Sequence, residues 1–423
     1  MKKKKIVKIM AVMLSVIMII TASPEFFGKI FKTFSNMEIS GSVIKNTESI
    51  DDIVVDNTED DYTVLPVANE VVDTSGTVIA AAAITVLGDA SFPDTYAELL
   101  ATGKNTFYIK TYQDWLNLQA LSKENDLDGF TFTINNNNTP GVKNFSVYEL
   151  DSLPGFTGIG SEEHPFAGTL KCSSTNGISY NVKAPVFQYL SAKATVRNLH
   201  IRCTGNTCVA GLAKTLTGSG TLKLENIFVS GSVINKTTDG GAGGLFSEII
   251  NNEADGLYVS VTKETGASRN GIALGVTGTD TALSTKLTIS GYCSGSIAGI
   301  VKGNVIFEYD NDVISIKNTS IAGTNSNGDN GFLFGRMESL EGHKPVIRFI
   351  KDADIMPRFG YSNSLGNSGG IVGYGKECII DTAGHTVTIE SSSIDSNGNH
   401  GASNYVDIYG NTGNNEKSGV FNF

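Results

Sequence analysis

The chain has 423 residues and a formal net charge of −11, and loss of its first 22 residues, with five lysines and no acid, would make the charge about −16. Such an acidic chain has no electrostatic reason to bind nucleic acid or anionic lipid, so we expect neither as a partner. Its 47 glycines and its low share of charged residues, 18%, favour many short strands joined by tight turns. The same composition disfavours a coiled coil or a helical bundle.

Residues 1–22 have the pattern of a secretory signal peptide. Lysines 2–5 form its basic end, residues 9–22 form an apolar run, and Ala22-Ser23 supplies small residues for cleavage. The apolar run is short for a membrane span, which needs about 20 residues, so an uncleaved anchor is the alternative. In both cases we expect a secreted or cell-surface protein with no membrane contact beyond this segment.

Residues 23–88 are interpreted as an acidic, flexible spacer. Acids such as Asp51, Asp52 and Glu59 are nearly unopposed by Lys45. A stretch of this composition buries too little apolar surface to offset its ordering entropy.

Residues 89–168 are predicted to form an N-terminal cap and the first coils of a repeat array. Residues 107–109 and 130–134 have strand patterns, and a helix is expected to begin at Thr111, with Asp114 in its first turn. Trp115, Leu118 and Leu121 fall on one face of that helix. We expect the helix to cover the open edge of the first coil, because unpaired strand edges promote aggregation.

A repeated phrase of small residues followed by apolar residues fills residues 169–423. Examples are Gly243-Gly244-Leu245-Phe246 and Gly369-Gly370-Ile371-Val372, and the second small residue recurs at 211, 244, 271, 299, 331, 370 and 419. Repeats of this length are typical of stacked units, none of which can bury its apolar face alone. Because short strands of period two lie between the phrases, we predict an all-β fold, a parallel β-solenoid with its apolar pairs inside.

An alignment of these strands places Asn198, Asn226, Gly256 and Lys286 in one column. Asn and Gly tolerate left-handed backbone angles, as a turn at one corner of each coil requires. Stacked Asn side chains can also hydrogen-bond along such a column.

The phrase Gly-Gly-Ile-Val-Gly at 369–373 resembles the GLUG-type repeats of secreted bacterial proteins. The segment from Trp115 through 130–132, 158–160 and 165–169 resembles the opening of pectate-lyase-like, right-handed β-helix surface proteins. The resemblance covers roughly residues 105–423. It implies a right-handed parallel β-helix with an N-terminal capping helix, in a Gram-positive-type surface or secreted protein that is often adhesive. An LPxTG-like sorting signal is not found, and the sequence stops within a glycine phrase, which would suit a truncated chain, an incomplete reading frame or an oligomerising end.

Parallel β-helices also carry polysaccharide lyases and glycoside hydrolases, so the side chains have to decide between binding and catalysis. Hydrolysis needs paired carboxylates, and lyase chemistry needs a bound cation and a base. The candidate catalytic residues are Arg348, Asp352, Asp354 and Arg358, and the alternative for them is a charged outer face. Asp310 and Asp312 also lie close together in sequence, with the same alternative.

The candidate ligand-binding residues are Arg197, His200 and Arg202. His200 alternates with apolar Leu199 and Ile201, so we expect it to face outward beside the two arginines. The trio could contact an acidic glycan, or it could form an ordinary solvated face.

Metals and cofactors are not expected. The five cysteines are irregularly spaced and include no CxxC pair, so they are interpreted as buried small residues, although Cys203 and Cys208 could close a small loop. The stretch 325–329 is interpreted as a turn rather than a calcium loop, and no dinucleotide or P-loop motif is present.

The leading functional hypothesis is a non-catalytic adhesin or display scaffold that contacts cell-surface or host glycans or proteins. The alternative is a carbohydrate-active enzyme, either a polysaccharide lyase or a glycoside hydrolase. A purely structural stalk is the third possibility.

Overall fold

The structure is a computed structural model that describes residues 43–44, 71–72, 78–80, 92–134, 147–172, 178–205, 207–263, 271–275, 286–323, 328–356, 359, 367–389, 409–412 and 416–422. The chain divides into two units, residues 1–91 and 92–423. In the first unit, three short strands pair in an antiparallel sheet: β1 (Val43–Ile44), β2 (Val71–Val72) and β3 (Val78–Ala80). The predicted signal peptide and most of the predicted spacer lie outside the described residues.

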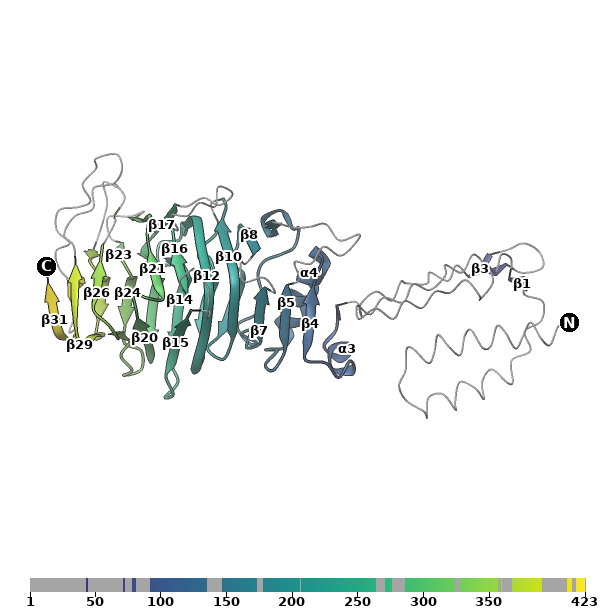
Figure 1. The fold of residues 1–423 in the computed structure, drawn as a ribbon, viewed down its shortest axis with the longest axis horizontal. Coiled ribbons are helices and arrows are strands. Elements are labelled where there is room, and N and C mark those ends of the chain that lie inside the picture. Colours follow the sequence, from purple (N-terminus) through teal and green to yellow (C-terminus); the bar gives the residue numbers. More distant parts are fainter. Residues whose placement is uncertain are drawn as a thin grey trace. The chain divides into compact units, whose positions relative to one another are not determined.

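The second unit is built from strands that follow one another along one axis (Figure 1). Every strand pairing described in this unit is parallel and joins residues of different turns of the chain. The predicted all-β class with parallel strands is thereby confirmed. The pairings define three sheets, which we call the long, second and narrow sheets.

The long sheet contains the greatest number of strands. They are β4 (Thr106–Ile109), β5 (Thr131–Ile134), β6 (Val147–Glu149), β7 (Thr169–Cys172), β8 (Ile178–Val182), β10 (Thr195–Cys203), β12 (Gly220–Ile234), β15 (Leu257–Thr262), β16 (Ile272–Leu274), β17 (Leu287–Gly291), β20 (Val305–Tyr309), β21 (Ile314–Ile316), β22 (Thr319–Gly323), β25 (Val346–Phe349), β26 (Ala353–Ile355), β29 (Ile379–Ile389) and β31 (Glu416–Asn422).

The second and narrow sheets each run through successive turns of the chain. The second sheet holds β9 (Phe187–Ser191), β11 (Ala213–Thr217), β14 (Phe246–Asn251), β19 (Ala298–Gly303), β24 (Phe334–Glu338), β28 (Val372–Lys376) and β30 (Tyr409–Thr412). The narrow sheet holds β13 (Gly241–Gly243), β18 (Cys293–Gly295), β23 (Asp329–Gly331) and β27 (Asn367–Gly369).

One apolar core runs through this unit. Backbone hydrogen bonds place five residues at equivalent positions of successive turns, and all five are fully buried in the same cluster: Leu212, Leu245, Ile297, Leu333 and Ile371. At the N-terminal end the core contains stacked rings, with Phe166 lying 6.0 Å from Phe132 and 5.3 Å from Phe187 between ring centroids. The glycine phrases therefore supply the interior of one continuous core, as their apolar pairs predict.

The period of the repeat differs from the predicted one. Leu212 and Leu245 are 33 residues apart, but the next turn extends over 52 residues to Ile297. The glycine phrase at 271 lies at β16 in the long sheet instead of at a corner of its own. It shares the small residue with the others because a Cβ at Gly271 would lie 2.5 Å from the Thr262 carbonyl oxygen.

Glycine recurs where the narrow sheet turns into the second sheet. Gly243 pairs with Gly295, and Gly331 pairs with Gly369. Four residues later, Gly335 packs against the preceding turn so closely that a Cβ there would lie 2.5 Å from the Ser294 nitrogen. Gly299 and Gly373 are equally restricted by narrow-sheet backbone. The glycine requirement therefore reflects close backbone contact at this corner.

The predicted Asn column is confirmed for two of its members. Asn198 and Asn226 have φ values of 60° and 55°, and the Asn226 amide donates to Asn198 Oδ1 at 2.8 Å. The assignment of Gly256 and Lys286 to this column is wrong, because their carbonyls accept from Gly220 and Gly231. β12 is long and pairs with three separate strands, β15, β16 and β17, so later turns do not repeat its spacing.

Two α-helices lie near the start of the unit: α3 (Tyr96–Ala101), which the sequence analysis missed, and α4 (Tyr112–Glu124). α4 begins as predicted, with a capping box between Thr111 and Asp114, and Trp115 and Leu118 are fully buried. A 3-10 turn, η2 (Leu150–Ser152), follows β6. Within the described part of the chain, no helix combines the length and apolar character of a membrane span.

Side chains of α4 bind the backbone of the segment 157–160, which lies beside β9 through the bridge between Ile159 and Phe187. Gln119 Oε1 accepts from the amides of Thr157 at 2.6 Å and Gly158 at 3.1 Å. Ser122 Oγ accepts from the amide of Gly160 at 2.9 Å. These amides would otherwise be unpaired donors at a strand edge.

We expect Gln119→Ala to lower the free energy of unfolding by about 1–3 kcal/mol, because it leaves the amide of buried Gly158 and the amide of Thr157 without their acceptor. Urea denaturation followed by circular dichroism would measure the change. Gln113→Ala is the matched control, since this exposed glutamine of α4 donates to Asn117 within the same helix at 2.7 Å. Equal stability of the two variants would refute the role given to Gln119.

We expect Gly335→Ala to destabilise the fold by about 2–3 kcal/mol, because the added methyl group has to displace rigid backbone. Gly342→Ala separates this effect from backbone strain: its Cβ meets no atom within 4 Å, but its φ is +83°. Thermal or urea unfolding should show that Gly335→Ala is clearly less stable than Gly342→Ala. The reverse order of stability would contradict the close-contact explanation.

Candidate functional site

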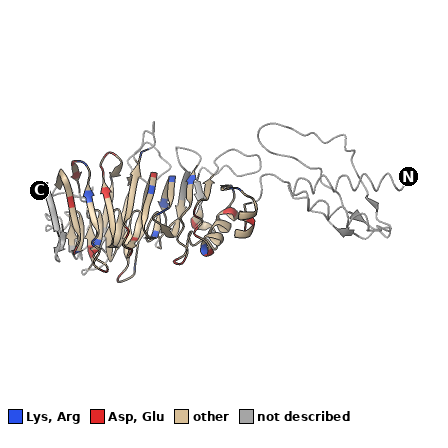
Figure 2. Ribbon diagram, turned by 90° about the horizontal axis from the view of Figure 1, so that it is seen from below, with Lys and Arg blue, Asp and Glu red and all other residues tan. Residues whose placement is uncertain are grey.

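Charged residues of both signs lie along the strands of the second unit (Figure 2). On the outer face of the long sheet, strand register places Glu308, Arg348 and Asp381 side by side on β20, β25 and β29. Arg348 lies 4.0 Å from Glu308 and 3.4 Å from Asp381, and its side chain is 42% exposed. We call these three residues the charge ladder. Arg348 is therefore already held between two carboxylates at the surface.

Two residues before the charge ladder, apolar side chains form a parallel row. Register aligns Tyr258, Ile306, Val346 and Ile379, which lie on β15, β20, β25 and β29. Tyr258 is 42% exposed, and the other three are partly exposed. We call this row the apolar stripe. The sequence did not predict the apolar stripe, because each of its residues resembles an ordinary strand residue until the register is known.

Lys351, just after β25, binds the two aspartates that follow β20. Its ammonium lies 2.5 Å from Asp312 and 3.3 Å from Asp310. The hydrogen bond from Lys351, followed by its charge, lowers the pKa of Asp312, and the same contact raises the pKa of Lys351. Asp310 also accepts from the Asp312 amide at 2.8 Å, so this group stabilises a turn.

The predicted catalytic residues do not converge. Asp352 accepts from the Thr386 amide at 2.8 Å and lies 3.6 Å from His385, and its side chain is 78% exposed. Asp354 is exposed on β26 opposite Thr388, and Arg358 lies outside the described residues. Among the described atoms, no contact joins any two of Arg348, Asp352 and Asp354. A hydrolytic pair needs two carboxylates that face one scissile bond.

The predicted basic trio is divided between different environments. Arg197 forms an ion pair with Glu225 on the next strand at 2.7 Å, and Arg202 is partly exposed. His200 alternates with the core residues Leu199 and Ile201 as expected, but it is only 3% exposed, because its ring packs edge-on against Phe228 at 4.5 Å, so it does not form a solvated face with the arginines. The alignment of Asn198 with Asn226 already places Arg197 opposite Glu225, so the sequence carried the signal for this pair.

A half-buried arginine cluster lies where β23 meets β24. Arg336 donates to the buried Asp329 carboxylate through Nε at 2.6 Å, and its guanidinium lies between the rings of Tyr292 and Tyr374, 5.8 and 5.4 Å from their centroids. Asp329, interpreted from sequence as the end of a turn, is thus a structural partner. Burial raises the pKa of neighbouring Cys293 to about 12.

All five cysteines are buried and free of disulfides, which confirms their interpretation as small core residues. Cys203 and Cys208 are neighbours, and the hydrogen bond between their thiols, together with burial, raises the pKa of Cys203. In the described part of the chain, no three His, Cys, Asp or Glu side chains are grouped as metal ligands would be.

We expect Arg336→Met to lower the free energy of unfolding by about 3–5 kcal/mol, because it leaves the buried Asp329 carboxylate without its cation. Arg348→Met should change it by less than about 1 kcal/mol, since the charge ladder is solvated. Urea denaturation at neutral pH measures both, and the double variant Asp329→Asn with Arg336→Met should recover part of the loss. Equal effects at the two arginines would contradict this ranking.

No protein-family model, curated protein or solved structure matches this chain. Its function therefore has to be inferred from its own residues.

Proposed function

We propose that the chain is an exported, non-catalytic adhesin or display scaffold at the cell surface that contacts glycans or partner proteins. In this proposal residues 92–423 form a right-handed parallel β-helix, and α4 covers its first coil. The parallel register supports a helical winding, and parallel crossovers are right-handed in about 98% of known cases. The contacts of Gln119 and Ser122 with edge amides support the covering role of α4.

The observation that carries the proposal is the outer face of the long sheet. The apolar stripe and the charge ladder run side by side across the same strands, from β20 to β29. Partly exposed apolar side chains beside hydrogen-bonding charges are typical of ligand-binding surfaces. A sugar chain presents apolar C–H faces and polar hydroxyl edges, which match the stripe and the ladder.

Catalysis has less support at the same face. Arg348 is held by Glu308 and Asp381, and Asp352 is held by a backbone amide. Lys351 is engaged by Asp310 and Asp312. Groups that neutralise one another stabilise turns and strand stacking. Among the described residues of this face, Arg348 and Lys351 each lie between the carboxylates that they neutralise, whereas hydrolysis needs two carboxylates that flank a scissile bond.

A glycan array probed with the purified protein, together with polysaccharide depolymerisation assays, tests the proposal. We expect binding without cleavage, and at least tenfold weaker binding by Tyr258→Ala and by Arg348→Ala. Tyr108→Ala is the control, because Tyr108 is an exposed tyrosine on β4 away from the stripe.

Cleavage that disappears in Asp352→Ala or Asp354→Ala would replace the proposal with the carbohydrate-active enzyme. An array without bound glycans, and without captured surface protein, would favour a structural stalk instead.

A further inference from the structure

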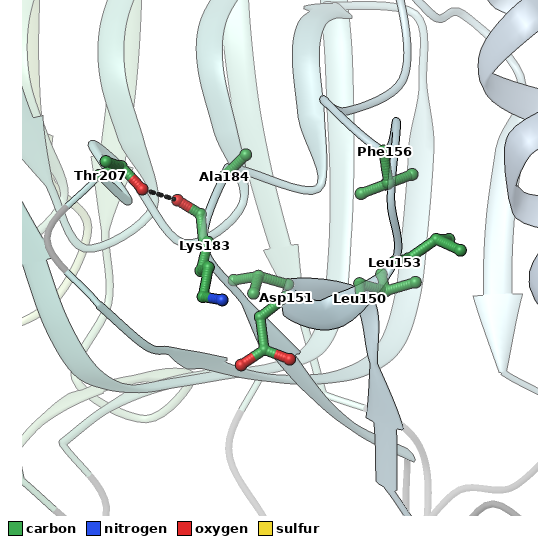
Figure 3. A pocket seen from close by; sticks show the side chains of 8 residues that line it. Leu150, Asp151, Leu153, Phe156, Lys183, Ala184 and Thr207 are labelled. Atoms are coloured by element: carbon green, nitrogen blue, oxygen red, sulfur yellow. Dashed lines mark hydrogen bonds between the residues drawn. The ribbon is translucent and has the colours of Figure 1, made fainter.

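A cavity of about 250 Å³ opens beside η2 at the end of β8 (Figure 3), and none of its lining residues belongs to the charge ladder or the apolar stripe. Leu150, Leu153 and Phe156 provide one wall. Lys183 and Thr207 lie across the cavity from Leu153 and Phe156 in Figure 3. The cavity therefore combines an apolar wall with a polar rim, the usual composition of a small-ligand site.

The polar groups of the rim can form further hydrogen bonds with a ligand. Asp151 Oδ2 accepts from the Thr204 hydroxyl at 2.7 Å, and its other carboxylate oxygen faces no donor among the described residues. The Thr207 hydroxyl donates to the Lys183 carbonyl at 2.9 Å and keeps its lone pairs. The ammonium of Lys183 is exposed and has no acceptor within the described ranges. Together these groups offer a cationic donor, an anionic acceptor and a hydroxyl acceptor.

From this arrangement we infer that the cavity binds a single neutral sugar ring, such as the terminal or branching unit of a glycan. The ring's C–H face would lie on Phe156 and the two leucines, and its hydroxyls would bond to Asp151 and Lys183. This choice of ligand class rests on the proposed function, whereas the site itself rests on the geometry of the cavity.

The volume of the cavity and the charges on its rim restrict the class of ligand further. Sites for larger ligands usually enclose about 300–1,000 Å³, so this cavity suits one ring rather than a chain. Asp151 and Lys183 carry opposite charges, so the site has no net preference for an acidic or a basic sugar. An acidic sugar would gain an attraction to Lys183 and meet a repulsion from Asp151.

The intrinsic fluorescence of a tryptophan can report binding at this site. Trp115 is its only tryptophan, and the Trp115 ring lies 5.9 Å from the ring of Phe156. Titration of the full-length protein with glucose, galactose, mannose or N-acetylglucosamine should give a saturable change in tryptophan fluorescence for at least one of them. Asp151→Asn and Lys183→Ala should each weaken that binding at least tenfold, because each removes one charged hydrogen bond.

Lys193→Ala is the matched control, since Lys193 is an exposed lysine in the turn after β9. The inference is overturned if none of the four sugars gives a saturable signal, or if Asp151→Asn and Lys183→Ala bind as tightly as the unmodified protein. The array of intact glycans keeps the two proposals separate. Glycan binding that depends on Tyr258 but not on Lys183 retains the proposed function and rejects the sugar site in this cavity.

Discussion

Parallel backbone hydrogen bonding between successive turns of the chain is the constraint on which the rest of the structure depends. It holds each strand in register with the strand one turn earlier and one turn later, so equivalent side chains lie about 4.8 Å apart. Rows of equivalent side chains in the described strands follow from this spacing. Asn226 bonds to Asn198, Arg197 pairs with Glu225, and Arg348 lies between Glu308 and Asp381. A favourable contact between two turns can therefore be repeated at the same position of the next turn, which forms a row. Exposed apolar residues at equivalent positions form a row in the same way.

The same constraint creates a problem at each end of a sheet, where amides and carbonyls lack a neighbouring strand. Near β9, side chains replace the missing strand: Gln119 and Ser122 of α4 accept from three backbone amides of the segment 157–160. The constraint also explains the glycines at the corner between the narrow and second sheets. Strands that turn sharply from one sheet into the other bring two backbones together, and the Ser294 backbone leaves no room for a methyl group on Gly335 of β24.

Charges in this protein differ in what they contribute. Asp329 is removed from water and half-buried Arg336 bonds to it at 2.6 Å, so the buried carboxylate depends on this cation. The charge ladder remains in solvent, where ion pairs add little to stability and their polar atoms remain accessible to a ligand. The buried pair and the solvated row therefore lie at different places: Arg336 and Asp329 at the corner between the narrow and second sheets, and the charge ladder on the outer face of the long sheet.

The sequence by itself determined the features that depend on local chemistry: the parallel all-β class, the capping box at Thr111, the buried cysteines and the left-handed Asn198–Asn226 corner. Residue types at short sequence spacing are sufficient to predict each of these features. The register between turns was decided only by the tertiary structure, because turn length varies from 33 residues after Leu212 to 52 after Leu245. Register decides which residues become neighbours. It therefore brought Phe228 beside His200 and aligned Tyr258 with Ile306 in a stripe that no single strand of the sequence reveals. The burial of Asp329 against Arg336, seven residues away in the same turn, was decided by packing at the corner between two sheets.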